Sequence, residues 1–223
     1  MAGEWTSPER ALEYLARAGA VPHRGEGEAV LLELLPERVG RILDVGAGDG
    51  RLLHLVKLAR PTATGIALDL SPTMLSEARR RFEDEESVKV VEHDLNHRLP
   101  AMGSFDAVVS SMAIHHLVDE RKRTLYEEIF DLLEPGGVFL SLERVASPTP
   151  NLRRRFRAAM GHDRCRDHDH DTDHDHDTED LSDRLLDLDT QLHWLREIGF
   201  ADVDCYWKWL ELALLGGVKP EDP

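Results

Sequence analysis

The sequence predicts a doubly wound α/β fold, in which helices cover both faces of a mainly parallel sheet. Short apolar runs alternate with segments that carry apolar residues at helical spacing, which is the pattern of consecutive βαβ units. The first apolar run ends in the glycine-rich segment LDVGAGDG (residues 43–50), typical of a ligand-binding turn between strand and helix. The 223 residues suffice for one well-cored domain and are short for two, so we expect a single domain over residues 1–223.

The N-terminal residues 1–37 are expected to form a helical cap on this domain. Ser7 and Pro8 form a typical helix start, and Gly19 ends that helix. A second short helix over residues 28–35 carries apolar residues at helical spacing and stops at the proline that follows it. The cap therefore precedes the first strand as a helix, a turn and a helix.

The central part of the chain predicts five strands with helices between them. Each strand is a short apolar run, and each helix carries its apolar residues on one side. The strands are expected over residues 41–45, 64–68, 88–91, 105–109 and 138–142. The helices are expected over residues 51–59, 72–82 and 120–133. The proline and two glycines of residues 135–137 predict the turn that ends the last of these helices.

The alternating pattern breaks after Ser147. Residues 151–188 are expected to form a lid-like insertion, which starts with a basic helix and contains a low-complexity His/Asp-rich loop over residues 162–180. Beyond the insertion we expect a helix over residues 191–198 and two strands over residues 202–207 and 210–218. A short turn between two final strands predicts an antiparallel hairpin at the sheet edge.

The composition restricts the partners and the location of the protein. With 43 acidic against 27 basic residues the net charge is −16, which argues against broad binding to nucleic acid because phosphate-neutralising cations are outnumbered. No run approaches the roughly 20 apolar residues of a membrane span, and residues 1–10 lack an apolar signal-peptide core. Cys165 and Cys205 form no CxxC pair. We expect a cytoplasmic protein without membrane contact.

The glycine-rich loop indicates which ligand it suits. A dinucleotide site has the spacing GxGxxG, whereas here the spacing is GxGxG and Arg51 stands where the last glycine should be. Asp44 and Asp49 flank the loop and would repel a pyrophosphate. They suit a cationic ligand that carries an amino group and a sulfonium centre, so the sequence argues against a nicotinamide dinucleotide.

Two further acids follow the next two strands. Asp69 lies about 20 residues beyond the loop, where an acid can accept hydrogen bonds from two ribose hydroxyls. Asp94 can accept from an adenine amino group, and Leu95 can line the pocket of the ring. The three strand ends together predict a site for an adenosine-containing ligand.

With these motifs the sequence resembles the class I S-adenosylmethionine (SAM)-dependent methyltransferases over residues 39–142. LDVGAGDG is similar to their SAM-binding loop, FDAVVSSMAIHHL (residues 105–117) to their fourth-strand motif, and LLEPGG (residues 132–137) to the turn before their fifth strand. The resemblance implies a seven-stranded Rossmann-like sheet of order 3-2-1-4-5-7-6 with strand 7 antiparallel, and SAM as cofactor. The implied cofactor-binding residues are Arg24, Asp44, Gly46, Ala47, Gly48, Asp69, Leu70, Asp94, Leu95 and Ser110.

The C-terminal part resembles the small-molecule branch of that superfamily, which includes ubiquinone and menaquinone methyltransferases and carboxy-SAM synthases. Residues 190–200, 206–209 and 212–217 are similar to the C-terminus of a carboxy-SAM synthase, and that activity is an alternative. A small-molecule methyl acceptor is the primary expectation. A third interpretation, an RNA methyltransferase, depends on the arginine cluster of residues 153–157. The sequence leaves open whether the protein forms a homodimer.

The acceptor is expected to approach the end of the fourth strand. Met112, His115 and His116 would line that side, and the two histidines are the candidate catalytic residues. Methyl transfer from a sulfonium needs a base only if the acceptor must lose a proton, and histidine can serve near neutral pH. Trp207 and Trp209 alternate with their neighbours along a strand, which suits either core packing or a flat substrate pocket.

The His/Asp-rich loop leaves two interpretations open. Its like charges favour an extended, solvated acidic loop. Alternatively, the protein is a metal-binding or metal-sensing module on a SAM-type fold, because histidine tracts often bind nickel, zinc or copper. The candidate metal ligands of this tract are His168, His170, His174 and His176. The primary expectation includes no physiological metal site.

Overall fold

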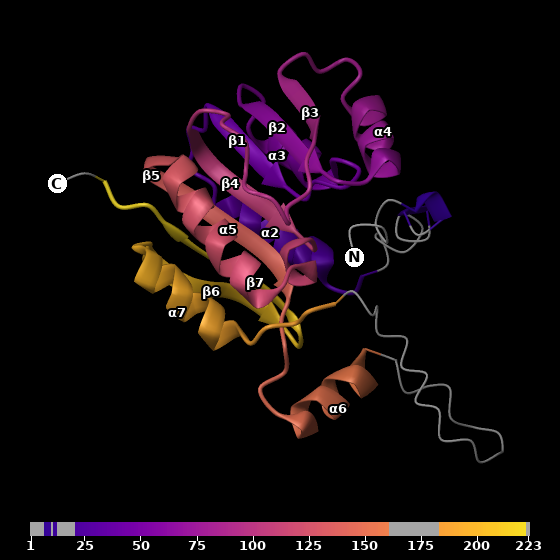
Figure 1. Cartoon of the computed structure of the whole chain (residues 1–223), viewed down its shortest axis with the longest axis vertical. Coiled ribbons are helices and arrows are strands. Elements are labelled where there is room, and N and C mark those ends of the chain that lie inside the picture. The colour runs from indigo at the N-terminus through magenta and orange to yellow at the C-terminus, as the bar shows by residue number, and fades with distance from the viewer. Residues whose placement is uncertain (1–6, 10, 13–20, 161–182, 222–223) are drawn as a thin grey trace.

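The computed structural model describes residues 7–9, 11–12, 21–160 and 183–221. They form a seven-stranded sheet with the order β3-β2-β1-β4-β5-β7-β6 (Figure 1). The strands are β1 (Arg41–Val45), β2 (Thr64–Asp69), β3 (Val88–Glu92), β4 (Phe105–Ser111), β5 (Leu133–Arg144), β6 (Ala201–Trp209) and β7 (Leu212–Val218). Strands β1 to β5 pair in parallel, and β7 pairs antiparallel with both β5 and β6. The expected strand order and terminal hairpin are confirmed.

Helices lie on both faces of the sheet. They are α2 (Arg24–Leu34), α3 (Arg51–Ala59), α4 (Pro72–Arg81), α5 (Asp119–Leu132), α6 (Pro150–Ala159) and α7 (Leu188–Ile198). Figure 1 shows α5 and α7 on the near face and α6 apart from the sheet, beyond the end of β5. In the described part of the chain no helix combines the length and the apolar character that crossing a membrane requires. The cytoplasmic location stays a prediction.

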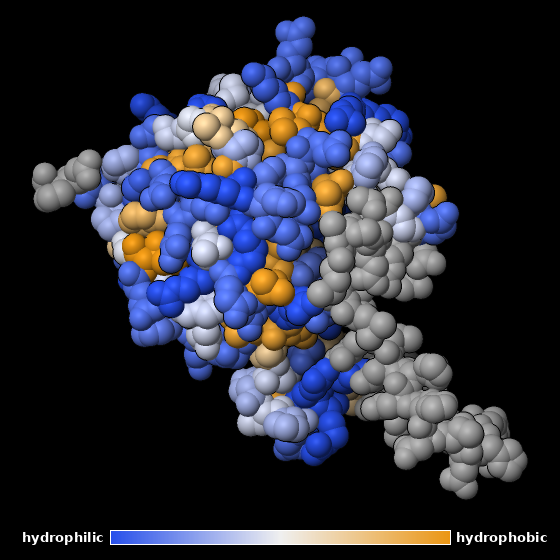
Figure 2. Space-filling view, in the orientation of Figure 1, coloured by the Kyte–Doolittle hydropathy of each residue, from blue (hydrophilic) through white to orange (hydrophobic). Residues whose placement is uncertain are grey.

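Two apolar clusters fill the space between the sheet and its helices. Successive strand residues point to opposite faces, so Ile42 belongs to the cluster beneath α2 and α3 whereas Leu43 belongs to the cluster beneath α5 and α7. All five residues of β1 except the first are buried, as expected for a central parallel strand. Outside, polar residues cover most of the face in Figure 2, with small apolar patches between them.

The predicted helix ends are explained by local capping. Ser71 precedes α4, and its hydroxyl accepts a hydrogen bond from the backbone N–H of Met74, while Pro72 occupies the first turn. The Asp187 side chain accepts from the backbone N–H of Thr190 at the start of α7. Gly199 ends that helix in the left-handed region, with φ of 117°. These caps set where α4 and α7 begin and where α7 ends.

Several element boundaries differ from expectation, among them the start of α7, which begins at Leu188 rather than at residue 191. Helix α2 begins at Arg24 rather than at residue 28. Strand β5 begins at Leu133, directly after α5, so the expected turn at residues 135–137 is a bulge within the strand. Phe105 pairs with Leu133 and Ala107 pairs with Val138. Residues 134–137, between Leu133 and Val138, therefore bulge out of the ladder. The first helix lies largely outside the described residues, and the His/Asp-rich loop with its four candidate metal ligands and Cys165 lies entirely outside them.

A second bulge changes the faces of β6. Cys205 pairs with Leu215 and Trp207 with Leu214, so Tyr206 is the extra residue and the expected alternation is broken. Tyr206 and Trp207 both pack against the cluster on the α2 side. A Cβ atom on Gly27 of α2 would lie only 3.0 Å from the Trp207 ring, which shows how closely helix and strand approach. Trp207 therefore packs in the core, as one of the two interpretations expected.

Candidate functional site

An open cavity lies at the carboxyl ends of β1, β2, β3 and β4. The empty space within it, including the part open to solvent, is about 860 Å³. In doubly wound sheets this edge is where ligands bind, because the loops after parallel strands converge there. The cavity is lined by Arg24, Gly46, Ala47, Gly48, Asp49, Asp69, Leu70, Ser71, Met74, Asp94, Leu95, Asn96, Ser111, Met112, Ala113, His116 and Leu117.

The glycine-rich loop forms the floor of this cavity. Gly46 has φ of 71°, and a Cβ atom there would lie 2.2 Å from Cβ of Ala113, so only glycine lets the loop approach the end of β4. Gly48 has φ of 56° and lines the cavity, and a Cβ atom there would meet nothing within 4 Å. The backbone at Gly48 is therefore open to a ligand, as the sequence predicted for this loop.

Asp69 joins the end of β2 to the glycine-rich loop. Its Oδ2 accepts a hydrogen bond from the backbone N–H of Gly48 at 2.8 Å, and its Oδ1 accepts from the N–H of Ser71 at 2.8 Å. Burial raises the pKa of Asp69 above its ordinary value, although these N–H groups oppose the rise. Each oxygen keeps a further lone pair, so the carboxylate can accept from two neighbouring hydroxyls in the cavity.

Arg24 is the cation of the cavity wall. Its Nε donates to Oε1 of Glu28 at 2.9 Å, and its Nη2 donates to the Ser111 hydroxyl at 3.2 Å. Buried Glu28 also accepts from Arg51, at 3.1 Å from Nε and 2.7 Å from Nη2. Two guanidinium groups thus share the carboxylate of Glu28 at the cavity wall. A guanidinium held in this way suits a ligand carboxylate.

The end of β3 supplies the third recognition element. Asp94 Oδ1 accepts from the backbone N–H of Asn96 at 2.9 Å and from its side-chain amide at 2.8 Å. This turn holds the carboxylate at the cavity, next to the apolar side chain of Leu95. A polar edge beside an apolar wall is what a flat heterocycle with an amino group requires.

Three residues expected at the site lie behind the cavity wall. Asp44 is fully buried in β1, where its Oδ2 accepts from the N–H of Leu53 at 3.1 Å, and burial raises its pKa to about 8. Ser110 is also fully buried, and its hydroxyl donates to the carbonyl of Val45 at 2.8 Å. Neither of the two lines the cavity. Side chains alternate along a strand, so in β4 it is Ser111 rather than Ser110 that takes the wall position. The third is His115.

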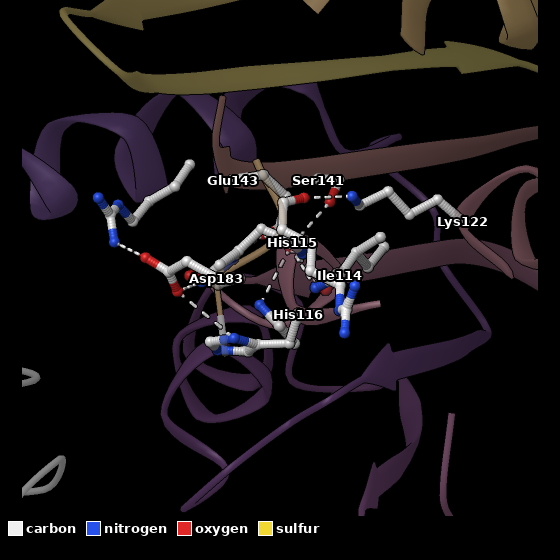
Figure 3. Close-up of polar contacts among 12 residues, drawn as sticks. Ile114, His115, His116, Lys122, Ser141, Glu143 and Asp183 are labelled. Atoms are coloured by element: carbon white, nitrogen blue, oxygen red, sulfur yellow. Dashed lines mark hydrogen bonds and ion pairs between the residues drawn. The ribbon is translucent and has the colours of Figure 1, made fainter. Parts of the chain in front are cut away.

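The two adjacent histidines have different environments. His116 lines the cavity, whereas His115 is buried, with Nδ1 2.6 Å from Oε2 of Glu143 (Figure 3). Glu143 Oε1 also accepts from the backbone N–H groups of Ala113 at 3.1 Å and Ile114 at 3.0 Å. Burial disfavours its charged form, but His115 and these N–H groups hold the pKa of Glu143 below its ordinary value. Glu143 therefore fixes the histidine turn.

Asp183 completes this cluster and was not predicted. Its Oδ1 lies 3.4 Å from Nε2 of His115 and 3.5 Å from Nδ1 of His116, and its Oδ2 pairs with Arg144. Burial disfavours the charged forms, yet mutual pairing lowers the pKa of Asp183 and raises that of His115. No motif surrounds Asp183 in the sequence, so only the fold brings it to the histidines.

A second cavity adjoins the cluster. Its empty volume is about 640 Å³, and it is lined by Ala146, Ser147, Arg153, Asp183, Leu185 and Glu211. Asp183 belongs to this cavity and contacts His116, which lines the first one. The histidine cluster thus lies between the two cavities.

Sequence reasoning placed most of the first cavity but missed several wall residues. Nine of the twelve expected cofactor or catalytic residues line it, and Met112 lies on the wall as expected for the acceptor side. The wall residues that were not predicted lie close in the sequence to the motifs, and this closeness is the feature that could have identified them. They are Ser71, Met74, Asn96, Ser111, Ala113 and Leu117, whereas Asp49 was expected to flank the loop.

Comparisons with known proteins agree with this geometry. The profile of a family described as "Methyltransferase domain" matches residues 42–137. An uncharacterized methyltransferase from Mycobacterium tuberculosis is 36% identical over 126 residues, which are 56% of this chain and 60% of that protein. A demethylmenaquinone methyltransferase from Clavibacter sepedonicus is 31% identical over 167 residues, 74% of this chain and 66% of that protein. The chain thus spans about three-fifths to two-thirds of these relatives.

Solved structures show the same fold. Human N-acetylserotonin methyltransferase in complex with SAM superimposes with a TM-score of 0.65 at 17% identity, over 98% of this chain and 58% of that one. The sheet has the strand order that the resemblance implied, and the family profile matches residues 42–137. The chain belongs to the class I SAM-dependent methyltransferases.

Proposed function

We propose that this protein binds SAM in the first cavity and transfers its methyl group to a small-molecule acceptor. The observation that carries the proposal is the hydrogen bond from the N–H of Gly48 to Asp69. It places a carboxylate that can accept from two hydroxyls beside a loop whose backbone is open to a ligand. Around the same cavity lie a cation at Arg24 and an apolar wall with a polar edge at Asp94 and Leu95. These residues fit the charged and uncharged parts of SAM.

Each part of SAM would meet a matching group. Arg24 would bind the carboxylate of the methionine moiety, and Asp69 would accept hydrogen bonds from the ribose hydroxyls. Asp94 would accept from the adenine amino group while Leu95 packs against the ring. When bound, SAM supplies a methyl group on a sulfonium, from which a neutral thioether is an excellent leaving group. The chain would contribute mainly by orienting the reactants and excluding water.

The acceptor would approach from the side of Met112, His116 and Leu117. His116 is the histidine that lines the cavity, so it would take up a proton where the acceptor must lose one. His115 would act only through its neighbours, because it is buried against Glu143. We assign it a positioning role. The acceptor class is supported by the small-molecule methyltransferase among the relatives and by the acidic charge of the chain.

We also propose that residues 151–188 cover the acceptor side as a lid, as their place in the sequence suggests. Two described parts support this. Asp183 contacts both histidines, and the backbone N–H of Arg184 donates to the carbonyl of His115 at 2.9 Å. The end of the insertion is thereby attached beside the cavity.

The proposal is tested by following the methyl group. The protein is incubated with methyl-labelled SAM and a cell extract divided into small molecules, RNA and protein. We expect label in the small-molecule fraction and loss of that label with Asp69→Ala. The exposed Asp84→Ala variant serves as the matched control, since it makes the same change away from the cavity. Label that enters only RNA or protein would contradict the small-molecule acceptor.

A further inference from the structure

Three potential metal ligands converge beside the first cavity. They are Nε2 of His115, Nδ1 of His116 and Oδ1 of Asp183, and one ligand atom from each residue lies within 4.8 Å of the others. They come from the turn after β4 and from the segment before α7, which are far apart in the sequence. Figure 3 shows the three side chains facing one another.

The separations within this cluster suit a shared ion better than direct hydrogen bonds. Oδ1 of Asp183 lies 3.4 Å and 3.5 Å from the two histidine nitrogens, whereas N–H···O bonds are about 2.7–3.2 Å long. With metal–ligand bonds of about 2.0–2.2 Å, two ligands of a tetrahedral ion stand about 3.4 Å apart. The observed separations match that edge length.

The outer atoms of the same side chains are already bound. Nδ1 of His115 lies 2.6 Å from Glu143, which directs Nε2 of that ring toward Asp183. Oδ2 of Asp183 pairs with Arg144, which leaves Oδ1 to face the histidines. Metal-binding histidines usually donate their second ring N–H to a carboxylate, and this partner fixes the orientation of the ring. The cluster has this arrangement.

We propose that His115, His116 and Asp183 bind one divalent transition-metal ion, such as Zn²⁺ or Co²⁺. Two imidazoles and one carboxylate are a ligand set that first-row transition metals accept with positions left open. His116 lines the first cavity and Asp183 lines the second, so the open positions would lie between them. If the proposed methyl transfer holds, an oxygen or nitrogen atom of the acceptor can occupy such a position, and the ion, rather than His116, would then favour loss of the acceptor's proton.

This site is distinct from the His/Asp-rich loop that the sequence analysis considered. None of its three ligands belongs to residues 162–180, and its ligands are held by Glu143 and Arg144. The loop would nevertheless contribute its own metal binding in solution. The four candidate ligands of the loop are therefore replaced before metal binding at this site is measured; we call the resulting protein loop-silenced.

The test measures metal binding without SAM, so its outcome is independent of the proposed methyl transfer. The starting protein carries His168→Asn, His170→Asn, His174→Asn and His176→Asn. Binding of Zn²⁺ is measured by equilibrium dialysis, and Co²⁺ is added as a probe whose visible spectrum reports its coordination. We expect one ion per chain with a Kd of about 1 μM or lower, together with a tetrahedral Co²⁺ spectrum.

Three single variants in this background locate the ion. Asp183→Asn and His116→Ala should each weaken binding at least about tenfold and change the Co²⁺ spectrum, and Glu143→Gln should weaken it by about 10–100-fold. The control is His193→Ala, because that histidine is exposed on α7. Circular dichroism checks the folding of each variant, and Asp183→Asn, which keeps the size of the side chain it replaces, tests the site if His116→Ala fails to fold.

Two results would overturn the proposal. One is a loop-silenced protein that binds neither ion with a Kd below about 100 μM. The other is binding that Asp183→Asn and His116→Ala leave unchanged. In either case the cluster is an ion pair in which His115 bridges Glu143 and Asp183 without a metal.

Discussion

The Oδ2 atom of Asp69 accepts a hydrogen bond from the backbone N–H of Gly48 at 2.8 Å. These residues follow two neighbouring parallel strands, so the contact joins the ends of β1 and β2 into one unit. The acid is thereby held in place before a ligand arrives. Preorganisation of this kind reduces the entropy that ligand binding must overcome.

Arg24 is predicted to discriminate SAM from its decarboxylated analogue. In the native protein SAM should bind at least about tenfold more tightly, because a charge-assisted pair with the carboxylate contributes about 1.4 kcal/mol or more. In Arg24→Ala this preference should disappear while the analogue loses little affinity. Calorimetric titration of both ligands into both proteins gives the comparison. A preference that survives the substitution would place the carboxylate elsewhere.

Gly46 and Gly48 are predicted to fail in different ways when changed to alanine. In Gly46→Ala the new Cβ atom would collide with Ala113, and the alanine backbone would have to adopt a left-handed conformation. The unfolding free energy should therefore fall by about 2–4 kcal/mol. Gly48→Ala meets no protein atom, so its stability loss should be about 1 kcal/mol, and its main effect should be weaker SAM binding. Urea unfolding and ligand titration separate the two effects. Equal stability losses would argue against this description of the loop.

Asp44 is predicted to make the protein less stable as pH rises. Its pKa rises from 3.8 to about 8 in the folded state, so the unfolded chain releases this proton first. The stability that the protonated group contributes is present below about pH 4 and is lost as pH rises to about 8. Asparagine at position 44 has no proton to lose, so the stability of Asp44→Asn does not change for this reason. The unfolding free energy of Asp44→Asn minus that of the native protein should therefore increase between about pH 4 and about pH 8. The slope is about 1.4 kcal/mol per pH unit at most. A difference that does not vary with pH would contradict the raised pKa.

The two histidines are predicted to differ in their effect on stability. In a chelator-containing buffer, His115→Ala should lower the unfolding free energy by about 3 kcal/mol, because it leaves buried Glu143 without its ionic partner. His116→Ala should lower it by less than about 1 kcal/mol, because that ring lines an open cavity. Urea denaturation of both variants tests the difference. Similar losses would mean that His116 also has a structural role.

The sequence predicted most strands and helices because central strands are continuous apolar runs and helices carry apolar residues at helical spacing. Ile42 and Leu43 face opposite clusters, and an apolar run of that kind indicates a doubly covered strand. The beginning of α2 was missed because Gly25 and Gly27 are poor helix formers. Close packing of Gly27 against Trp207 and Leu142 outweighs that low propensity, and packing is not visible in a local pattern.

The candidate site was predicted where a motif determined it and missed where tertiary contacts determine it. Gly48 and Asp69 lie at strand ends whose positions follow from the motif spacing. Whether Ser110 or Ser111 faces the cavity depends on the side of β4 to which each side chain points, and the motif alone does not determine that side. Asp183 reaches the histidines through pairing with Arg144 and the docking of Arg184, so its role required the folded chain.

The assignment of the first cavity to SAM is tested by calorimetric titration of SAM into the native protein, Asp69→Ala and Asp84→Ala. We expect micromolar binding to the native protein and to the Asp84→Ala control. Asp69→Ala should bind at least about tenfold more weakly, a loss of about 1.4 kcal/mol. Absence of SAM binding by the folded native protein, or equal affinity in all three proteins, would contradict the assignment of the first cavity to SAM.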